Sequence, residues 1–318
     1  MAEAQLEQYH ADMAGDVAQL IAQAFADHRH LPPLSLLWSS PPFTSVAELS
    51  RALSADAICA EASYVVLEAG RPVAAALACR KAEAIGWWRV ATAPDRRRRG
   101  LASRCLLAGE RALCEMGLST VATEEVVDSR WQAAGAMFQA LDYRLDAPER
   151  RNITMMVDGW AERAVTMPAG YELATLTEAD IEGWTQCRNQ VFNSDVGPDW
   201  FGQHFRSRPD FDATGWYLAK YRGRIIGIAG ALAVVDPRDP AAPPGGQIEY
   251  VGVVHEHRGK GLGQRLVSAC LNWLAQRGAT RSFLITQPFR VPAVRLYEKL
   301  GFRTIAAWHR WVKDLSVG

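Results

Sequence analysis

The sequence predicts a protein of the α/β (α+β) class with two similar domains in tandem. A glycine-rich loop followed by an amphipathic helix occurs twice. β-like and helical runs follow one another in nearly the same order in both halves. The chain has 318 residues, which suits two domains of roughly 150 residues each. Each half is therefore long enough to bury its own core.

The repeat is most evident in the two loops. The first has the pattern Arg97-x-x-Gly100-x-Ala102, and the second has Arg258-x-x-Gly261-x-Gly263. The offset is 161 residues at all three positions (258 − 97, 261 − 100, 263 − 102). Apolar residues then recur at helical spacing in both halves. Each helical pattern ends at a glycine, Gly117 or Gly278, which suits the left-handed position after a helix.

Each half is expected to contain, in order, a strand, helices, a hairpin, a long strand, the loop with its helix, a strand, a helix and a strand. Pro168-Ala-Gly170 interrupts this pattern before a strand expected at 171–176. We therefore predict an N-terminal domain at 1–160 and a C-terminal domain at 161–318. A proline-rich loop at 236–246 is expected between two strands of the second domain.

The second loop has the features of an anion site. It follows a β-like run at 247–254 and opens a helix, where the first backbone N–H groups have no helical partner. Gly261 and Gly263 let the backbone approach a ligand, and Arg258 and Lys260 add positive charge. The spacing is neither that of a Walker A loop nor G-x-G-x-x-G. The alternative is that these glycines only serve turns.

These motifs resemble the GNAT N-acetyltransferase superfamily. The loop resembles its acetyl-CoA loop, and Ala293-x-x-Leu296-Tyr297-x-x-x-Gly301-Phe302 resembles its second signature. The resemblance implies two tandem GNAT folds, each a mixed, mostly antiparallel central sheet flanked by helices. It also implies acetyl-CoA as co-substrate and no metal. The expected binding residues are Val253, Val254, Arg258, Gly259, Lys260, Gly261, Leu262, Gly263 and Gln264, with Arg97, Arg98, Arg99, Gly100 and Ala102 in the first half.

The resemblance also implies direct attack of an amine on a thioester. One residue is expected to take a proton from the amine and another to donate a proton to the leaving thiolate. Tyr297 matches the family tyrosine, and a phenol with a pKa of about 10 can protonate a thiolate of about 8.5. The alternative is a core tyrosine. Glu249 is the candidate base, because β alternation places Glu249, Val251 and Val253 on one face. The alternative is a solvated or salt-bridged glutamate. The backbone N–H near Val253–Val254 is the expected oxyanion donor.

The first half departs from this pattern. Phe138 stands where Tyr297 stands, and Trp88 stands where Glu249 stands. Its loop is retained, but the residues for proton transfer are absent. The layout resembles tandem family members whose C-terminal half is the catalytic one. We therefore expect a degenerate N-terminal domain and a catalytic C-terminal domain.

Two further features concern the acceptor side. Arg290 stands where family members often have an asparagine that contacts the pantetheine arm, so a contact with a phosphate or an acidic acceptor is an alternative. Trp184, Trp200 and Trp216 lie in the acceptor-side region by resemblance. They are expected either to form the floor of an acceptor pocket or to belong to the core.

The bulk composition indicates which partners to expect. Thirty-five basic residues balance thirty-five acidic ones, so we expect no nucleic acid or membrane partner. No apolar stretch approaches the roughly 18 residues of a membrane span. Six cysteines without C-x-x-C spacing are expected to be buried free thiols in a reducing compartment. We predict a cytoplasmic protein, either a monomer or a homodimer.

The sequence favours an acetyltransferase that acts on a primary amine of a small molecule in the C-terminal domain. One alternative is an enzyme that acetylates an amine of a protein or peptide. A second alternative is a non-catalytic acyl-CoA-binding sensor. Tyr297 and Glu249 in the same half favour an enzyme over a sensor.

Overall fold

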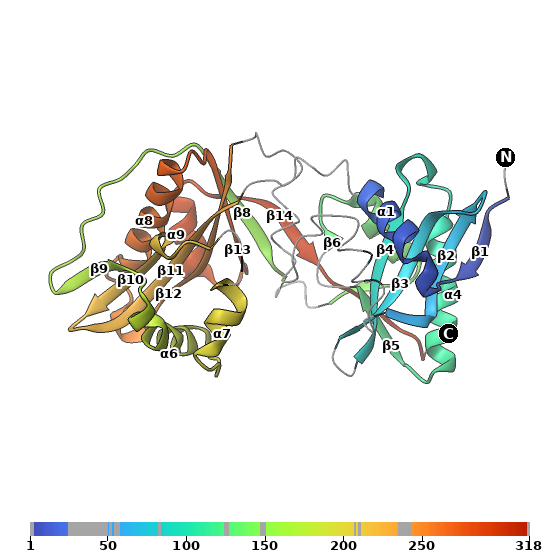
Figure 1. Cartoon of the computed structure of the whole chain (residues 1–318), viewed down its shortest axis with the longest axis horizontal. Helices are drawn as coiled ribbons and strands as arrows, with labels where there is room; N and C mark the ends of the chain where they lie inside the picture. The colour runs from blue at the N-terminus through green and yellow to red at the C-terminus, as the bar shows by residue number, and fades with distance from the viewer. Residues whose placement is uncertain are drawn as a thin grey trace. The chain divides into compact units, whose positions relative to one another are not determined.

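A computed structural model describes residues 3–24, 50, 53, 58–81, 84–123, 127–146, 151–206, 208, 211–234 and 243–316. The chain forms two compact units (Figure 1). Unit 1 contains Met1–Arg151 and Ala307–Gly318, and unit 2 contains Asn152–Ala306.

The described part of unit 1 is built on a sheet with the strand order β1-β2-β3-β4-β5-β15-β7. The strands are β1 (Gln5–Gln8), β2 (Ile58–Glu68), β3 (Arg71–Lys81), β4 (Ala84–Thr92), β5 (Thr120–Thr123), β7 (Arg144–Leu145) and β15 (Trp311–Asp314). The helices are α1 (Ala14–Ala24), α4 (Leu101–Glu115) and α5 (Gln132–Ala140). β4 and β5 are parallel, and the other neighbours are antiparallel.

Helices cover both faces of this sheet because β3 alternates between two cores. Ala74, Ala76 and Ala78 pack in one core with residues of α4 and α5. Ala75 and Leu77 pack in the other core with residues of α1. The small side chains of β3 let the helices lie close to the strand.

The second sheet has the order β6-β14-β8-β13-β12-β11-β10-β9. Its strands are β8 (Ile153–Asp158), β9 (Tyr171–Thr175), β10 (Trp216–Tyr221), β11 (Arg224–Val234), β12 (Gly245–Val253), β13 (Arg281–Thr286) and β14 (Arg303–His309). β6 (Val127–Asp128) pairs with residues 308 and 309 of β14, which belong to unit 1. The helices are α6 (Ile181–Phe192), α7 (Asp199–Phe201), α8 (Leu262–Gln276) and α9 (Val291–Lys299).

In unit 2, α6 and α8 lie on opposite faces of the sheet (Figure 1). A Cβ added at Gly252 of β12 would meet Val191 of α6, whereas one at Gly246 would meet Leu274 of α8. β12 and β13 are parallel, and the antiparallel pairings include β9 with β10 and β8 with β13. The predicted class, two mixed and mostly antiparallel sheets flanked by helices, is confirmed.

The units do not follow the predicted division at 160/161, because the last strand of each half pairs in the other sheet. β8 at the end of the first half pairs with β13 of unit 2. β15 at the end of the second half pairs with β5 of unit 1. Pairing between strands far apart in the chain leaves no local signal, so a contiguous pattern predicts only a contiguous division.

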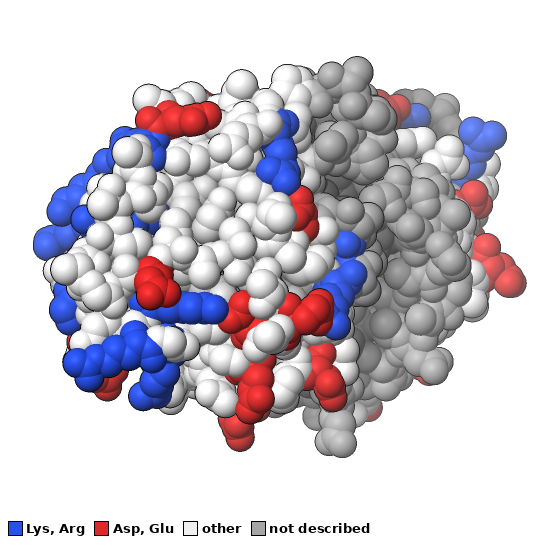
Figure 2. Space-filling view, turned by 60° about the vertical axis from the view of Figure 1, so that its left-hand side comes forward, with Lys and Arg blue, Asp and Glu red and all other residues white. Residues whose placement is uncertain are grey.

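Three other observations bear on the bulk expectations. No helix among the described residues is long and apolar enough to cross a membrane. All six cysteines are free thiols, five of them buried, while Cys114 is exposed. On the face that Figure 2 shows, basic side chains gather mainly along the left edge and acidic ones lie mostly lower on the face.

Candidate active site

The two loops have the same backbone conformation. Gly259 and Gly261 have φ of 79° and 72° in the second loop. Arg98 and Gly100 have φ of 63° and 72° in the first. α4 and α8 then begin directly after Gly100 and Gly261. A left-handed arginine is uncommon, so the first loop keeps the conformation even without its first glycine.

The second loop presents unpaired backbone donors at the start of α8. In the described chain, the N–H groups from Gly259 to Gln264 donate to no acceptor. Leu262 is 2% exposed and anchors the helix, whereas Gln264 is exposed. A Cβ at Gly263 would lie 2.9 Å from Leu296, so a glycine there lets α9 pack against the start of α8. Free donors at a helix N-terminus form an anion site.

The other predicted binding residues of this half contact the loop itself. The Nε atom of Arg258 donates to the carbonyl of Val253 at 2.8 Å. Lys260 Nζ donates to the Glu256 carbonyl at 3.5 Å. The N–H of Val254 donates to the Ile226 carbonyl at 2.9 Å, so this amide is committed to the sheet. The oxyanion donor expected near Val253–Val254 therefore stays a prediction, with Val253 as the remaining candidate of the two.

The first loop differs in its charge. Arg96 and Arg99 donate to the two carboxylate oxygens of Glu68, at 2.7 and 3.1 Å. The hydrogen bond from Arg96 is the main reason that the pKa of Glu68 lies below its ordinary value. Arg97 donates to the carbonyl of Ala24. Ala102 follows in the first turn of α4.

The second unit has no carboxylate at the corresponding place. Glu68 and Tyr221 each end a hairpin strand before a two-residue left-handed turn. Tyr221 contacts the His257 ring at 5.1 Å, and the Tyr171 hydroxyl lies 2.9 Å from His257 Nδ1. Glu68 thus reduces the positive potential of the first loop, and the second loop lacks this effect.

A β-bulge in β12 determines where Glu249 points. Gly252 lies opposite Ile228 and Glu249 lies opposite Gly230, so two residues of β12 face one residue of β11. One of the two, Tyr250, has a φ of 52°. A bulky residue in the left-handed region is a strained conformation that surrounding packing must hold.

The bulge overturns the predicted alternation. A Cβ at Gly230, opposite Glu249, would meet the ring of Trp216 on the α6 side. Gly227 lies opposite Val253, and a Cβ there would meet Leu266 of α8. Glu249 and Val253 therefore lie on opposite faces of the sheet.

The carboxylate of Glu249 has polar neighbours. Gln247 donates to Oε1 of Glu249. The Nη1 atom of Arg208 lies 3.9 Å from the same oxygen, and the Glu249 side chain is 16% exposed. The parallel pairing of β12 with β13 extends from Gly245 only to Gln247. Glu249 thus lies just beyond the point where the two strands stop pairing.

The first unit lacks the carboxylate, and the register shift of its strand β4 lies before Trp87, so no bulge follows Trp88. β4 pairs continuously with β3 from Cys79 opposite Trp87 to Ala74 opposite Thr92. Trp88 is 3% exposed, and its ring lies 2.5 Å from the Cβ position of Gly109 on α4. Trp88 therefore fills the core on the α4 side, and only a glycine on α4 leaves room for it.

The tyrosine and phenylalanine of the second signature exchange places between the units. Tyr297 packs edge-on against Phe302 at 6.0 Å, and Phe138 packs edge-on against Tyr143 at 5.2 Å. Tyr297 is 5% exposed, and burial raises its pKa above the ordinary value, while the charge of Arg290 opposes this. In unit 1 the Tyr143 hydroxyl donates to buried Glu110 at 2.8 Å.

The tryptophans expected at an acceptor pocket differ in their surroundings. Trp184 and Trp216 are fully buried, so they belong to the core. Trp200 is half-buried and stacks beneath the guanidinium of Arg188. The ring of Tyr250 contacts all three tryptophans, and this packing holds the bulge. Sequence reasoning missed Tyr250, Arg188 and Arg208, because the bulge that gathers them has no sequence signature.

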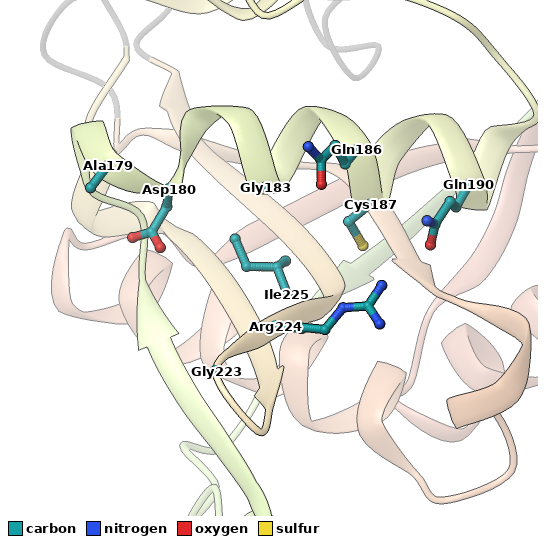
Figure 3. Close-up of a pocket in the computed structure, with 9 residues that line it drawn as sticks. All are labelled: Ala179, Asp180, Gly183, Gln186, Cys187, Gln190, Gly223, Arg224 and Ile225. Carbon is teal, nitrogen blue, oxygen red and sulfur yellow. The ribbon is translucent and has the colours of Figure 1, made fainter.

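A pocket of about 260 Å³ lies elsewhere in unit 2, between α6 and the β10–β11 hairpin (Figure 3). Its lining includes Asp180, Cys187, Gln190 and Arg224 but none of the predicted site residues. No group of three or more metal-ligating side chains occurs in the part of the chain that the structure describes.

Comparison with known proteins identifies a family. A family model described as "Acetyltransferase (GNAT) family" matches residues 31–143 and 178–302. A mycothiol acetyltransferase of Thermobispora bispora is 33% identical over 158 residues, 48% of this chain and 51% of that protein. One of Clavibacter michiganensis is 31% identical over 250 residues, 74% of this chain and 75% of that protein. The chain thus spans about half or less of the length of the first relatives it matches.

A solved structure matches nearly the whole chain in fold. A tandem GNAT protein from the clavulanic acid biosynthesis pathway matches with a TM-score of 0.69 and 17% identity. The match covers 98% of this chain and 99% of that protein. Identity at this level supports the tandem fold and carries no information on the substrate.

Proposed function

Because the chain belongs to the acetyltransferase (GNAT) family, we propose that it transfers the acetyl group of acetyl-CoA to a primary amine of a small molecule, and that unit 2 carries the reaction. The bulge at Tyr250 is the observation that carries this assignment, because the register shift of β4 lies elsewhere, between Ile85 and Trp87, and leaves Trp88 in the core. It turns Glu249 towards α6, next to the end of the β12–β13 pairing.

The proposed chemistry assigns one proton transfer to each of two residues. Glu249 takes the proton of the attacking amine, directly or through a water molecule. The neutral amine nitrogen bonds to the acetyl carbon, the nitrogen of the tetrahedral intermediate releases its second proton to water, and the carbon–sulfur bond then breaks. Tyr297 donates its proton to the departing thiolate. The raised pKa of Tyr297 keeps its hydroxyl protonated beforehand.

The free amides at Gly259–Gln264 support the proposed binding of the CoA pyrophosphate in unit 2. The same backbone conformation at Arg98 and Gly100 supports at most a retained binding site in unit 1. Phe138 and Trp88 there have no group that can accept or donate the required protons. Unit 1 is thus proposed to be degenerate in catalysis.

Thiol release from acetyl-CoA over a panel of amines tests this function. We expect turnover with small amines and a loss of roughly 100-fold or more in kcat for Tyr297→Phe, as for removal of a general acid. Phe138→Leu is the matched control in unit 1 and should leave kcat unchanged. Acceptance of peptides alone would favour protein acetylation, and binding of acetyl-CoA without turnover would favour a sensor.

A further inference from the structure

Arg188 of α6 is held rigidly beside the bulge. Its guanidinium carbon lies 4.1 Å from the centroid of the Trp200 ring and 5.6 Å from that of Tyr250. Its Nη1 donates to Asn189 Oδ1 at 3.3 Å and to Ser194 Oγ at 2.6 Å. Stacking and these two bonds fix the orientation of the planar group, which limits the entropy lost on binding a ligand.

None of the described residues supplies a negative charge to this arginine. Within the described residues, no carboxylate pairs with Arg188, and its two hydrogen bonds go to neutral oxygens. Its Nε is buried and has no acceptor in that part of the chain. A partly buried guanidinium without a counter-ion is costly, and an anionic ligand would relieve that cost.

Among the described residues, positive charge exceeds negative charge around Tyr250 and Tyr297. Burial raises the pKa of the Tyr250 phenol and the Glu249 carboxylate raises it further, while Arg188 and Arg208 oppose both. Arg290 acts in the same direction on Tyr297. Three guanidinium groups thus act on these phenols against one carboxylate.

Aromatic contacts connect these arginines along the site. The Arg290 guanidinium lies 5.9 Å from the Phe192 ring, and Phe192 lies 5.8 Å from Tyr250. Of the three arginines, Arg208 already lies beside Glu249. Arg290 donates to the amide oxygen of Gln287, which is neutral. Among the described residues, Arg188 and Arg290 therefore have only neutral hydrogen-bond acceptors.

An amine with a pKa of about 10.4 arrives at neutral pH as an ammonium ion. An acceptor that carried only this charge would be repelled by the arginines. An acceptor with an anionic group as well would pair that group with a guanidinium and its ammonium with Glu249. Charge complementarity therefore favours a zwitterionic acceptor.

We infer that the acceptor of unit 2 carries an anionic group, a carboxylate or a phosphate, and that Arg188 binds it beside Tyr250. This inference rests on the proposed function and names the chemical class of its substrate. Arg188 is then a specificity-determining residue on the α6 side of β12, and Glu249 acts on the amine of the same molecule.

The test compares matched amines with the full-length protein. One series pairs each amino acid with its carboxamide and with the amine that lacks the carboxylate. A second pairs aminoalkyl phosphates with their parent amino alcohols. We expect kcat/KM to be at least about tenfold higher for the anionic member of one series, as for a charge-assisted hydrogen bond. The preferred series identifies the anion as carboxylate or phosphate.

The variant Arg188→Met should reduce this preference to about twofold or less, while KM for acetyl-CoA stays unchanged. Arg188→Lys should restore part of the preference, because it retains the charge without the planar fork. The control Arg303→Met removes an exposed arginine of the same unit, 71% exposed, and should change nothing.

Two results would overturn the inference separately from the proposed function. Turnover of neutral amines equal to that of anionic ones overturns the anionic acceptor and leaves the acetyltransferase intact. A preference that survives in Arg188→Met overturns the role of this arginine. Absence of thiol release with every amine overturns the proposed function and the inference together. The wild-type comparison stands even if Arg188→Met does not fold.

Discussion

Replacing Lys313 by methionine should destabilise unit 1 strongly, although Lys313 lies five residues from the C-terminus of the chain. Lys313 belongs to β15, and its Nζ lies 2.7 Å from Oε2 of Glu110 on α4. The side chains of the lysine and the glutamate are 18% and 7% exposed. The other oxygen of Glu110 accepts the hydrogen bond of Tyr143. The substitution would leave a buried carboxylate with a single neutral donor.

Breaking a buried pair from one side costs about 3–5 kcal/mol, and the partial exposure of Lys313 favours about 3 kcal/mol. For domains of 150–250 residues, this corresponds to a fall of about 6–12 °C in the midpoint of the unit 1 transition. Calorimetry measures the midpoint and the free energy of the transition, and hydrogen exchange at β5 and β15 shows that the loss lies in unit 1. Arg281→Met is the matched control, because it removes a pair with 55% and 39% exposed side chains and should cost less than about 1 kcal/mol.

The double variant Lys313→Met with Glu110→Leu should recover much of the loss, since no unpaired charge remains. If Lys313→Met costs no more than Arg281→Met, the buried pair does not hold β15 in unit 1. Faster exchange confined to unit 2 would contradict the pairing of β15 with β5 itself.

Three further predictions concern the loops, the tyrosine and the bulge. Glu68→Gln removes the carboxylate that pairs with Arg96 and Arg99. On a Gly261→Glu background, calorimetric titration should then show that the affinity of the first loop for CoA rises about two- to fivefold. An unchanged affinity contradicts the neutralising role of Glu68. Burial raises the pKa of Tyr297, and the protonated phenol is the form that donates the proton. The value of kcat should therefore not fall between about pH 8 and 10. A fall in kcat at about pH 8 that disappears in Tyr297→Phe would refute this. Gly230→Ala places a Cβ 2.8 Å from the Trp216 ring, so it should lower the free energy of unfolding of unit 2 by about 1–3 kcal/mol in urea. The control Gly197→Ala adds a Cβ in open space and should change that free energy by no more than about 0.5 kcal/mol.

The loops were predictable because their conformation is encoded locally. Glycines at the left-handed positions, apolar residues at helical spacing and glycines at the helix ends are all readable along the chain. The positions of α4 and α8 therefore follow from the repeat. The difference between the two second signatures was also evident from the sequence, because Phe138 stands in the first half where Tyr297 stands in the second. The fold class followed from the same local signals and from the family resemblance.

The site was predictable only in part, because it depends on strand register. One extra residue in β12 places Glu249 on the α6 face of the sheet and Val253 on the α8 face. No residue type in the sequence predicts this bulge. The same shift gathers Tyr250 and Arg188, which are far apart in sequence. The exchange of β8 and β15 likewise depends on pairing between distant segments. Sequence periodicity cannot indicate which sheet a strand joins.

The central claim, that one loop serves the reaction and the other does not, is tested by paired substitutions at Gly261 and Gly100. Both have a φ of 72°, so glutamate introduces the same backbone strain and the same negative charge at either loop. Gly261→Gln and Gly100→Gln control for strain without charge. In an assay of thiol release, we expect Gly261→Glu to lower kcat/KM for acetyl-CoA about tenfold or more below Gly261→Gln. Gly100→Glu should remain within about twofold of Gly100→Gln. Loss of turnover in Gly100→Glu with full turnover in Gly261→Glu would contradict the assignment of catalysis to unit 2.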